Sequence, residues 1–222
     1  MPLPTRVRVS GPDAVSFLQG QLSQDVADLG VGSASWSFLL EPQGKVVAFL
    51  RVERTADDAL ELATDAPPEL VMERLERFKL RVKATIETVA AEPVAAADEE
   101  ARIAAGLPGH ADVSGRIPGE TGLVPVAVSF TKGCYTGQEL VARVDSRGNN
   151  VPRLLRRVEA QAPVHAGDSV VVEGQVRGEI TSAAGAAAIA SVHRSVEVPA
   201  DALVRSGSHE VMARLLAVPP VV

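Results

Sequence analysis

The sequence has little cysteine, few aromatic residues and no excess of positive charge, and each shortage excludes a class of function. Cys134 is the single cysteine among 222 residues, so the chain cannot form an internal disulfide or a four-thiolate metal site. Aromatic residues make up 3% of the chain, which disfavours a broad stacking platform for single-stranded nucleic acid. With 28 acidic and 22 basic residues, the net charge of −6 is unsuited to a general binder of phosphate backbones. We therefore expect no direct nucleic-acid binding.

Long hydrophobic runs are also missing. The N-terminus lacks a basic region followed by an apolar stretch, and the alanine-rich segment 183–192 is too short to span a membrane. A reducing compartment suits the single thiol, so we expect a cytoplasmic protein with no membrane partner. The histidines are scattered without metal-ligand spacing, and no metal site is expected. They are His110, His165, His193 and His209.

The N-terminal two thirds of the chain alternate between helix and strand patterns. At 46% hydrophobic and 23% charged residues, the composition is that of a packed globular protein. Ser10 is expected to cap a helix that runs to about Gly20. The turn residues 41–44 predict a hairpin between apolar runs, since proline and glycine favour tight turns. The other expected elements are strands at 34–40, 45–54 and 60–64, a helix opened by Pro67-Pro68, an acidic connector at 92–100, and a short helix ended by 106–109.

A basic stripe accompanies the next expected strand. Between Lys79 and Ile86, apolar residues alternate with basic or polar ones in the two-residue period of a half-buried strand. We interpret the basic side as a solvated face, with a binding surface as the alternative.

The sequence pattern changes in the C-terminal part of the chain. After Pro152, short β-type runs separated by Gly, Pro and Asp predict a small antiparallel barrel or sandwich. The expected runs are 154–159, 169–173, 176–182, 186–193 and 203–216. We place a domain boundary near Val151-Pro152, which gives domains 1–151 and 152–222.

The segment from Ser129 to Val144 contains the candidate chemistry. A helical pattern begins near Gly137, and Thr136 with Glu139 has the spacing of a capping box. Cys134 would then precede a helix N-terminus, where the helix dipole and the charge of Lys132 both favour a thiolate. Each residue also has an alternative interpretation without a ligand. Cys134 could be an inert small hydrophobic residue, and the Glu139 carboxylate could be fully used in the capping box. Tyr135 could only pack in the core, and Gly133 and Gly137 could only allow turns.

The ordered string Lys-Gly-Cys-Tyr-Thr-Gly-Gln-Glu at 132–139 is more specific than its members. It resembles the signature of the YgfZ family, folate-binding relatives of the glycine cleavage system T-protein that act in iron–sulfur cluster maintenance. Weaker similarity extends to 11–26, 40–49, 60–83 and 178–182. The resemblance implies an α+β fold, with a T-protein-like body and a small C-terminal antiparallel β-barrel, and a cavity for tetrahydrofolate.

The resemblance also implies site residues. Glu139 would recognise the pterin ring, with Cys134 as the functional thiol beside it. The supporting residues would be Lys132, Tyr135, Gln138 and Arg143. Lys132, Arg143 and Arg147 would supply positive charge for the glutamate tail of folate. We expect sulfur and carboxylate to share the mouth of one pocket between the two lobes.

Three functions follow as hypotheses. The first is a folate-binding accessory protein for iron–sulfur cluster assembly or repair, with iron–sulfur client or assembly proteins as partners. The second is a folate-dependent aminomethyltransferase or demethylase in which Asp65 or Glu139 acts on the substrate amine. The third is a scaffold that has lost its ligand. Aminomethyltransferases use an aspartate after a strand end that contains asparagine, and this chain reads Leu62-Ala63-Thr64-Asp65 in that region.

Overall fold

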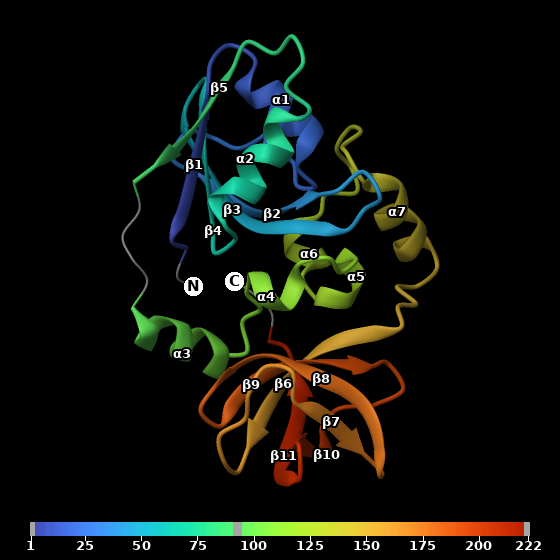
Figure 1. The fold of residues 1–222 in the computed structure, drawn as a ribbon. Coiled ribbons are helices and arrows are strands. Elements are labelled where there is room, and N and C mark those ends of the chain that lie inside the picture. The colour runs from blue at the N-terminus through green and yellow to red at the C-terminus, as the bar shows by residue number, and fades with distance from the viewer. Residues whose placement is uncertain (1–2, 91–94, 220–222) are drawn as a thin grey trace.

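The computed structural model describes residues 3–90 and 95–219, which form two halves with helices between them (Figure 1). The first half is an antiparallel sheet with strand order β2-β3-β4-β1-β5. Its elements are β1 (Thr5–Ser10), α1 (Ala14–Gln21), β2 (Ala34–Leu40), β3 (Val46–Ala56), β4 (Ala59–Thr64), α2 (Pro68–Glu76) and β5 (Thr85–Val89). The helices that follow are α3 (Ala96–Ala104), α4 (His110–Val113), α5 (Pro118–Thr121), α6 (Val124–Ala127) and α7 (Gln138–Ser146).

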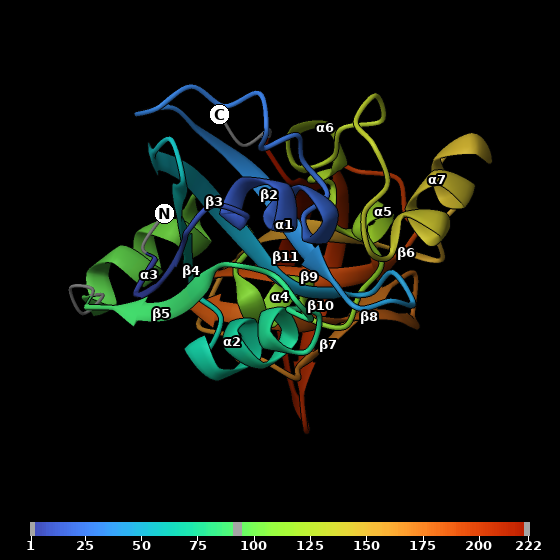
Figure 2. The ribbon, with the colours of Figure 1, turned by 90° about the horizontal axis from the view of Figure 1, so that it is seen from above.

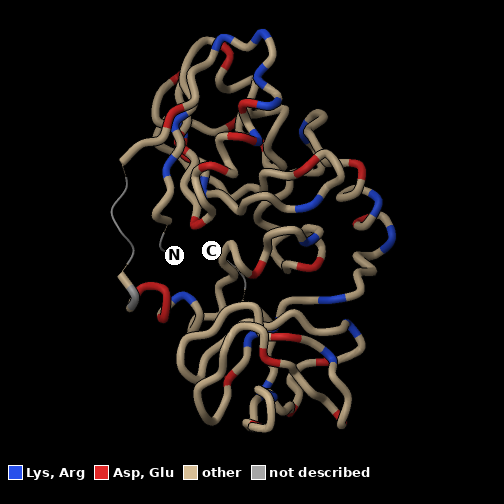
Figure 3. The backbone as a smooth tube through the Cα atoms, in the orientation of Figure 1, with Lys and Arg blue, Asp and Glu red and all other residues tan. Residues whose placement is uncertain are grey.

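The second half is a closed antiparallel barrel with strand order β10-β11-β6-β9-β8-β7. Its strands are β6 (Arg153–Ala160), β7 (Ser169–Val172), β8 (Gln175–Ala184), β9 (Ala187–His193), β10 (Ala200–Ser206) and β11 (His209–Ala217). The expected barrel is confirmed over the sandwich, because β10 pairs with both β7 and β11 and so closes the sheet. Figure 3 shows residues of both charge signs in each half.

The N-terminal sheet separates two hydrophobic cores, because alternate residues of a strand point to opposite faces. α1 and α2 cover one face, where Leu18, Leu50 and Leu75 are buried. Seen from above, both helices lie on the side away from the barrel (Figure 2). The other face contributes Phe38 to a second core that also contains Ile189 of the barrel. This second core therefore joins the two halves.

Several sequence predictions are confirmed. β2 and β3 form the expected hairpin, with Gly44 at a φ of 82° in its turn. β4 covers the predicted strand, and α2 begins directly at Pro68.

The strand expected from Lys79 is wrong for most of its length. β5 begins only at Thr85, and the preceding residues form a turn in which Leu80 is 83% exposed. Two contacts hold this turn: the Lys83 N–H donates to the Asp13 carboxylate at 2.8 Å, and the Asp13 N–H donates to the Lys83 carbonyl at 3.3 Å. These bonds use the backbone groups of Lys83 that a strand ladder would need. The basic residues thus lie on a surface turn, outside the sheet.

Three element boundaries also differ from expectation. Ser10, the expected cap of α1, still belongs to β1, and the cap position is Asp13, whose side chain makes no capping bond. α3 begins at Ala96, inside the expected connector, of which residues 92–94 lie outside the described part. The single run expected at 203–216 is a hairpin, because Gly207 turns the chain at a φ of 59°.

Candidate functional site

The loop before α7 is tied to the end of α1 by Lys132. Its ammonium donates to the carbonyls of Gln19 and Leu22, both at 2.7 Å, and of Gln24 at 2.9 Å. An ammonium group has three N–H donors, so these three bonds use all of them. Burial lowers the pKa of Lys132 to about 8, against the opposing charge of Asp25. The charge of Lys132 thus serves to position the loop.

Tyr135 anchors the same loop from inside. Its ring is buried in the core shared by the two halves, and the Lys132 ammonium lies 5.2 Å from the ring centroid. Burial raises the pKa of Tyr135 to about 12, so the phenol stays protonated at neutral pH. The Gln138 side chain accepts a hydrogen bond from the Tyr135 N–H at 3.2 Å. Lys132, Tyr135 and Gln138 thus form one supporting unit, and a direct ligand contact from them stays a prediction.

A contact between two glycines places the start of α7. Gly137, at a φ of 85°, precedes the helix, and a Cβ there would lie 2.7 Å from the Glu41 carbonyl oxygen and 3.1 Å from Gly44 Cα. A Cβ on Gly44 would meet Leu140 Cβ at 2.6 Å. Only residues without a side chain allow the backbones to approach so closely. The hairpin motif and the 132–139 motif therefore meet at these glycines.

The expected capping box at the start of α7 is wrong. The cap position is Gly137, which has no side chain to donate or accept a bond. The Thr136 hydroxyl lies instead at 3.4 Å from both the Gly20 carbonyl and the Gln21 side-chain oxygen, so it faces α1. Glu139 therefore takes no part in capping, and its carboxylate is left for another role.

The two residues expected to carry the chemistry are both exposed. Cys134 is a free, exposed thiol in the loop, and Glu139 is exposed in the first turn of α7. Arg143 lies one helical turn further along and is exposed as well, as is Arg147 at the helix end. The exposed side of α7 and its C-terminal end thus carry two carboxylates, those of Glu139 and Asp145, and two guanidinium groups.

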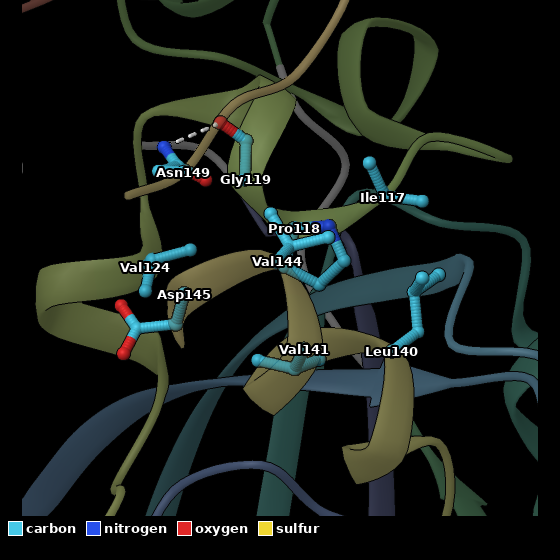
Figure 4. Close-up of a pocket in the computed structure, with 9 residues that line it drawn as sticks. All are labelled: Ile117, Pro118, Gly119, Val124, Leu140, Val141, Val144, Asp145 and Asn149. Carbon is cyan, nitrogen blue, oxygen red and sulfur yellow. Dashed lines mark hydrogen bonds between the residues drawn. The ribbon is translucent and has the colours of Figure 1, made fainter. Parts of the chain in front are cut away.

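A pocket lies against the opposite side of α7 (Figure 4). Leu140, Val141 and Val144 line it from α7, and Asn149 closes one end by donating to the Gly119 carbonyl at 3.2 Å. The remaining lining residues are Ile117, Pro118, Gly119, Val124 and Asp145. Neither Cys134 nor Glu139 lines this pocket. Cys134 precedes α7, and Glu139 lies on the exposed side of the helix, away from the pocket. The expectation of a pocket mouth shared by these two residues is therefore not met here.

Sequence reasoning missed a buried arginine beside the motif. Arg74 of α2 donates to the Leu40 carbonyl at 2.8 Å and to the Gln21 side chain at 3.1 Å, and its guanidinium lies 4.1 Å from the Phe78 ring centroid. Burial lowers the pKa of Arg74, which the charge of Glu41 partly offsets. Gln21 links this group to the loop before α7. A helical pattern alone places Arg74 on α2 and offers no sign that it turns inward.

A second missed cluster joins the body to the barrel. Asp112 of α4 is completely buried, and its Oδ2 accepts the Gly109 N–H at 2.8 Å and lies 3.3 Å from the Arg102 guanidinium. Its Oδ1 accepts the hydroxyls of Ser182, at 2.8 Å, and of Thr181. A carboxylate with this many donors is well satisfied despite its burial. Asp112 therefore connects α3, α4 and β8.

Asp65 lies next to this cluster, at the end of β4. Its Oδ2 accepts the His110 N–H at 2.6 Å, while Asp65 Oδ1 and His110 Nδ1 are buried without a hydrogen-bond partner. Burial raises the pKa of Asp65. Hydrogen bonds from the backbone N–H groups of His110 and Asp65, and the charge of Arg102, oppose this rise. A Cβ on Gly109 would lie 2.5 Å from Asp65 Oδ2 and 2.8 Å from Arg102 Cζ, so a larger residue there would displace these side chains.

Within the described residues, no group of three or more histidine, cysteine or acidic side chains is arranged to hold a metal ion. No helix of the described ranges is both long and apolar enough to cross a membrane.

Comparison with known proteins finds sequence relatives but no family model that matches the chain. The tRNA-modifying protein YgfZ of Edwardsiella ictaluri is 28% identical over 280 residues, which covers 90% of this chain and 84% of that protein. An uncharacterized protein of Haemophilus influenzae is 28% identical over 225 residues, with 80% of each chain covered. An aminomethyltransferase of Lysinibacillus sphaericus is 38% identical over only 60 residues, or 27% of this chain and 16% of that enzyme.

A solved structure has the same fold. The glycine cleavage system aminomethyltransferase T of Bartonella henselae superimposes with a TM-score of 0.76 at 18% sequence identity, over 98% of this chain and 84% of that one. The expected fold class is thus confirmed: an α+β body of the T-protein type, followed by an antiparallel barrel. Within this class, the chain is similar in sequence to proteins named YgfZ, in agreement with the resemblance of its 132–139 motif.

Proposed function

We propose that this protein binds tetrahydrofolate and acts as a YgfZ-type accessory protein in iron–sulfur cluster assembly or repair. The relatives named tRNA-modifying proteins suggest that its clients include enzymes of tRNA modification. The observation that carries the proposal is the exposed start of α7. There Cys134 is a free thiol, and the carboxylate of Glu139 is not used for capping.

The residues at this end of α7 suit the chemistry of a folate. A carboxylate accepts two parallel hydrogen bonds from an aminopyrimidine edge, which is the role proposed for Glu139. Arg143 and Arg147 are exposed and suit the anionic glutamate tail, while Lys132 is engaged by carbonyls. Tetrahydrofolate, when bound, supplies a carrier for one-carbon groups. The chain itself would bind and orient the ring, with Tyr135 and Gln138 holding the loop.

Calorimetric titration with tetrahydrofolate tests the binding step. The substitution Glu139→Gln is expected to weaken binding by about 10- to 100-fold, because it replaces a charged acceptor of two hydrogen bonds. Glu100→Gln, at an exposed position of α3, is the matched control and should bind like the wild type. Equal binding by both variants would remove Glu139 from the site. No binding by the wild type would favour a scaffold without ligand.

Complementation in cells tests the thiol separately. In cells that lack the protein, we expect Cys134→Ser to lower the activity of an iron–sulfur enzyme at least about tenfold relative to the wild-type gene, because a hydroxyl replaces the more reactive thiolate. Thr131→Ala, in the same exposed loop, should retain full complementation. Equal melting temperatures would exclude misfolding. Full activity of Cys134→Ser would end the proposed role of the thiol without affecting the folate proposal.

A specific observation also favours one-carbon transfer as a second candidate function. Asp65 has a raised pKa and a buried carboxyl oxygen without a partner, as suits a group that exchanges protons with an amine. Turnover of a methylated amine with tetrahydrofolate that is lost in Asp65→Asn would support this function. Wild-type turnover no faster than buffer would exclude it for that amine.

A further inference from the structure

The outside of the barrel carries an apolar row that the proposed function does not use. Val176 of β8 pairs with Val171 of β7, Val171 with Leu203 of β10, and Leu203 with Met212 of β11. Directly paired residues project to the same face of a sheet. None of the four belongs to the cluster of side chains inside the barrel, which contains strand neighbours of Val171, Leu203 and Met212 instead, although Val171 is itself only 2% exposed. The row therefore crosses four strands on the outer surface.

Part of this row is open to solvent. Val176 is 62% exposed and Met212 is 49% exposed, which makes them two of the most exposed large apolar side chains of the described residues. The surface is hollowed beside Met212: Val171, Leu203 and Met212 line a cavity of about 240 Å³ that opens to solvent. A hollow with an apolar floor is a typical place for a partner side chain to insert.

Carboxylates border the hollow. Glu173, in the turn between β7 and β8, and Asp201 of β10 both line it. A second hollow adjoins at Glu173 and adds Glu197, with Arg177 as its basic member. Neither Glu173 nor Asp201 forms an ion pair within the described part of the chain, although Arg214 is the strand partner of Asp201. The border of the apolar hollow is therefore predominantly acidic.

We propose that this face of the barrel, defined by Val171, Val176, Leu203, Met212, Glu173 and Asp201, docks a segment of a partner protein rich in Lys or Arg and apolar residues. Long basic side chains place an apolar stem on an apolar surface and a charged head beside carboxylates. Such a side chain matches the hollow in both respects.

A synthetic peptide of matching chemistry tests the proposal on the full-length protein. The probe is a fluorescently labelled peptide that does not occur in this chain, Lys-Val-Arg-Leu-Lys-Phe-Arg, and its control carries Glu at every basic position. Fluorescence anisotropy should detect binding of the basic peptide that weakens with salt, and no binding of the acidic one. Failure of the wild type to bind the basic peptide would overturn the proposal.

Two variants separate the charged and apolar contributions. Asp201→Lys and Met212→Ser should each weaken peptide binding at least fivefold, and their melting temperatures separate this loss from unfolding, because both side chains are exposed. Asp57→Lys changes the net charge as Asp201→Lys does, but at an exposed turn of the body, and should bind normally. Equal weakening by the two lysine variants would overturn the proposal in favour of non-specific attraction. Self-association of the wild type that Asp201→Lys abolishes would overturn it in favour of a second copy of this chain.

Discussion

Replacing Asp112 by alanine is expected to lower the free energy of unfolding by about 3 kcal/mol, because it removes one partner of a buried ion pair. The Arg102 side chain is 1% exposed and would retain Glu99, which is partly exposed, as its ion-pair partner, together with its bond to the Leu107 carbonyl. Ser182 and the Gly109 N–H would lose their acceptor as well. Burial lowers the pKa of Arg102, but bonds and charges from Glu99 and Asp112 outweigh this effect and raise it. A guanidinium is not deprotonated in proteins, so Arg102 stays charged when Asp112 is gone.

Urea unfolding at neutral pH measures this effect. Asp168→Ala is the control, because Asp168 is also buried but accepts only a backbone N–H, from His165 at 2.8 Å. We expect it to cost about 1 kcal/mol, the typical contribution of one such bond. An Asp112→Ala cost no greater than that of Asp168→Ala would contradict the role of Asp112 as a joint between the halves.

Replacing Gly137 by alanine is expected to cost about 3 kcal/mol, through two effects that add. A residue with a Cβ pays about 1–2 kcal/mol for the left-handed conformation. The new Cβ would also lie 2.7 Å from the Glu41 carbonyl oxygen, and such overpacking typically costs about 1–3 kcal/mol. Relief of this collision would move the start of α7 away from the hairpin, so folate binding should weaken together with stability.

Gly133→Ala provides a matched comparison in the same loop. No atom lies within 4 Å of a Cβ built on Gly133, so we expect a change within about 0.5 kcal/mol. Thermal unfolding of both variants, with tetrahydrofolate titration of each, measures the difference. If both variants unfolded alike, the close approach of Gly137 to the hairpin would not be important for the fold.

The order of helices and strands was largely predictable, because most of it rests on local patterns. The turn at Gly44 and the proline before α2 determine nearby backbone angles whatever the rest of the chain does. For the segment around Leu80, the prediction from local pattern was wrong. Its alternation is that of a strand, but Asp13, seventy residues earlier in the chain, binds the backbone at Lys83.

The candidate site was predictable in its residues and less so in their arrangement. The ordered string at 132–139 was sufficient to indicate the family. It did not indicate that Lys132 turns to the carbonyls at the end of α1, or that Gly137 caps α7 in place of Thr136. Arg74 and Asp112 were missed, because a charged residue in a polar segment is expected at the surface.

The amino-acid order thus sufficed for the β2–β3 hairpin, for β4, for most of the barrel strands and for the motif that contains Cys134 and Glu139. These depend on turn chemistry, on periodicity and on a contiguous string, all of which act over a few residues. The fold alone determined which charges are buried, which glycines touch and which side of α7 meets the pocket. These depend on contacts between segments far apart in the chain, such as Asp112 with Ser182, whose geometry exists only after the two halves have packed together.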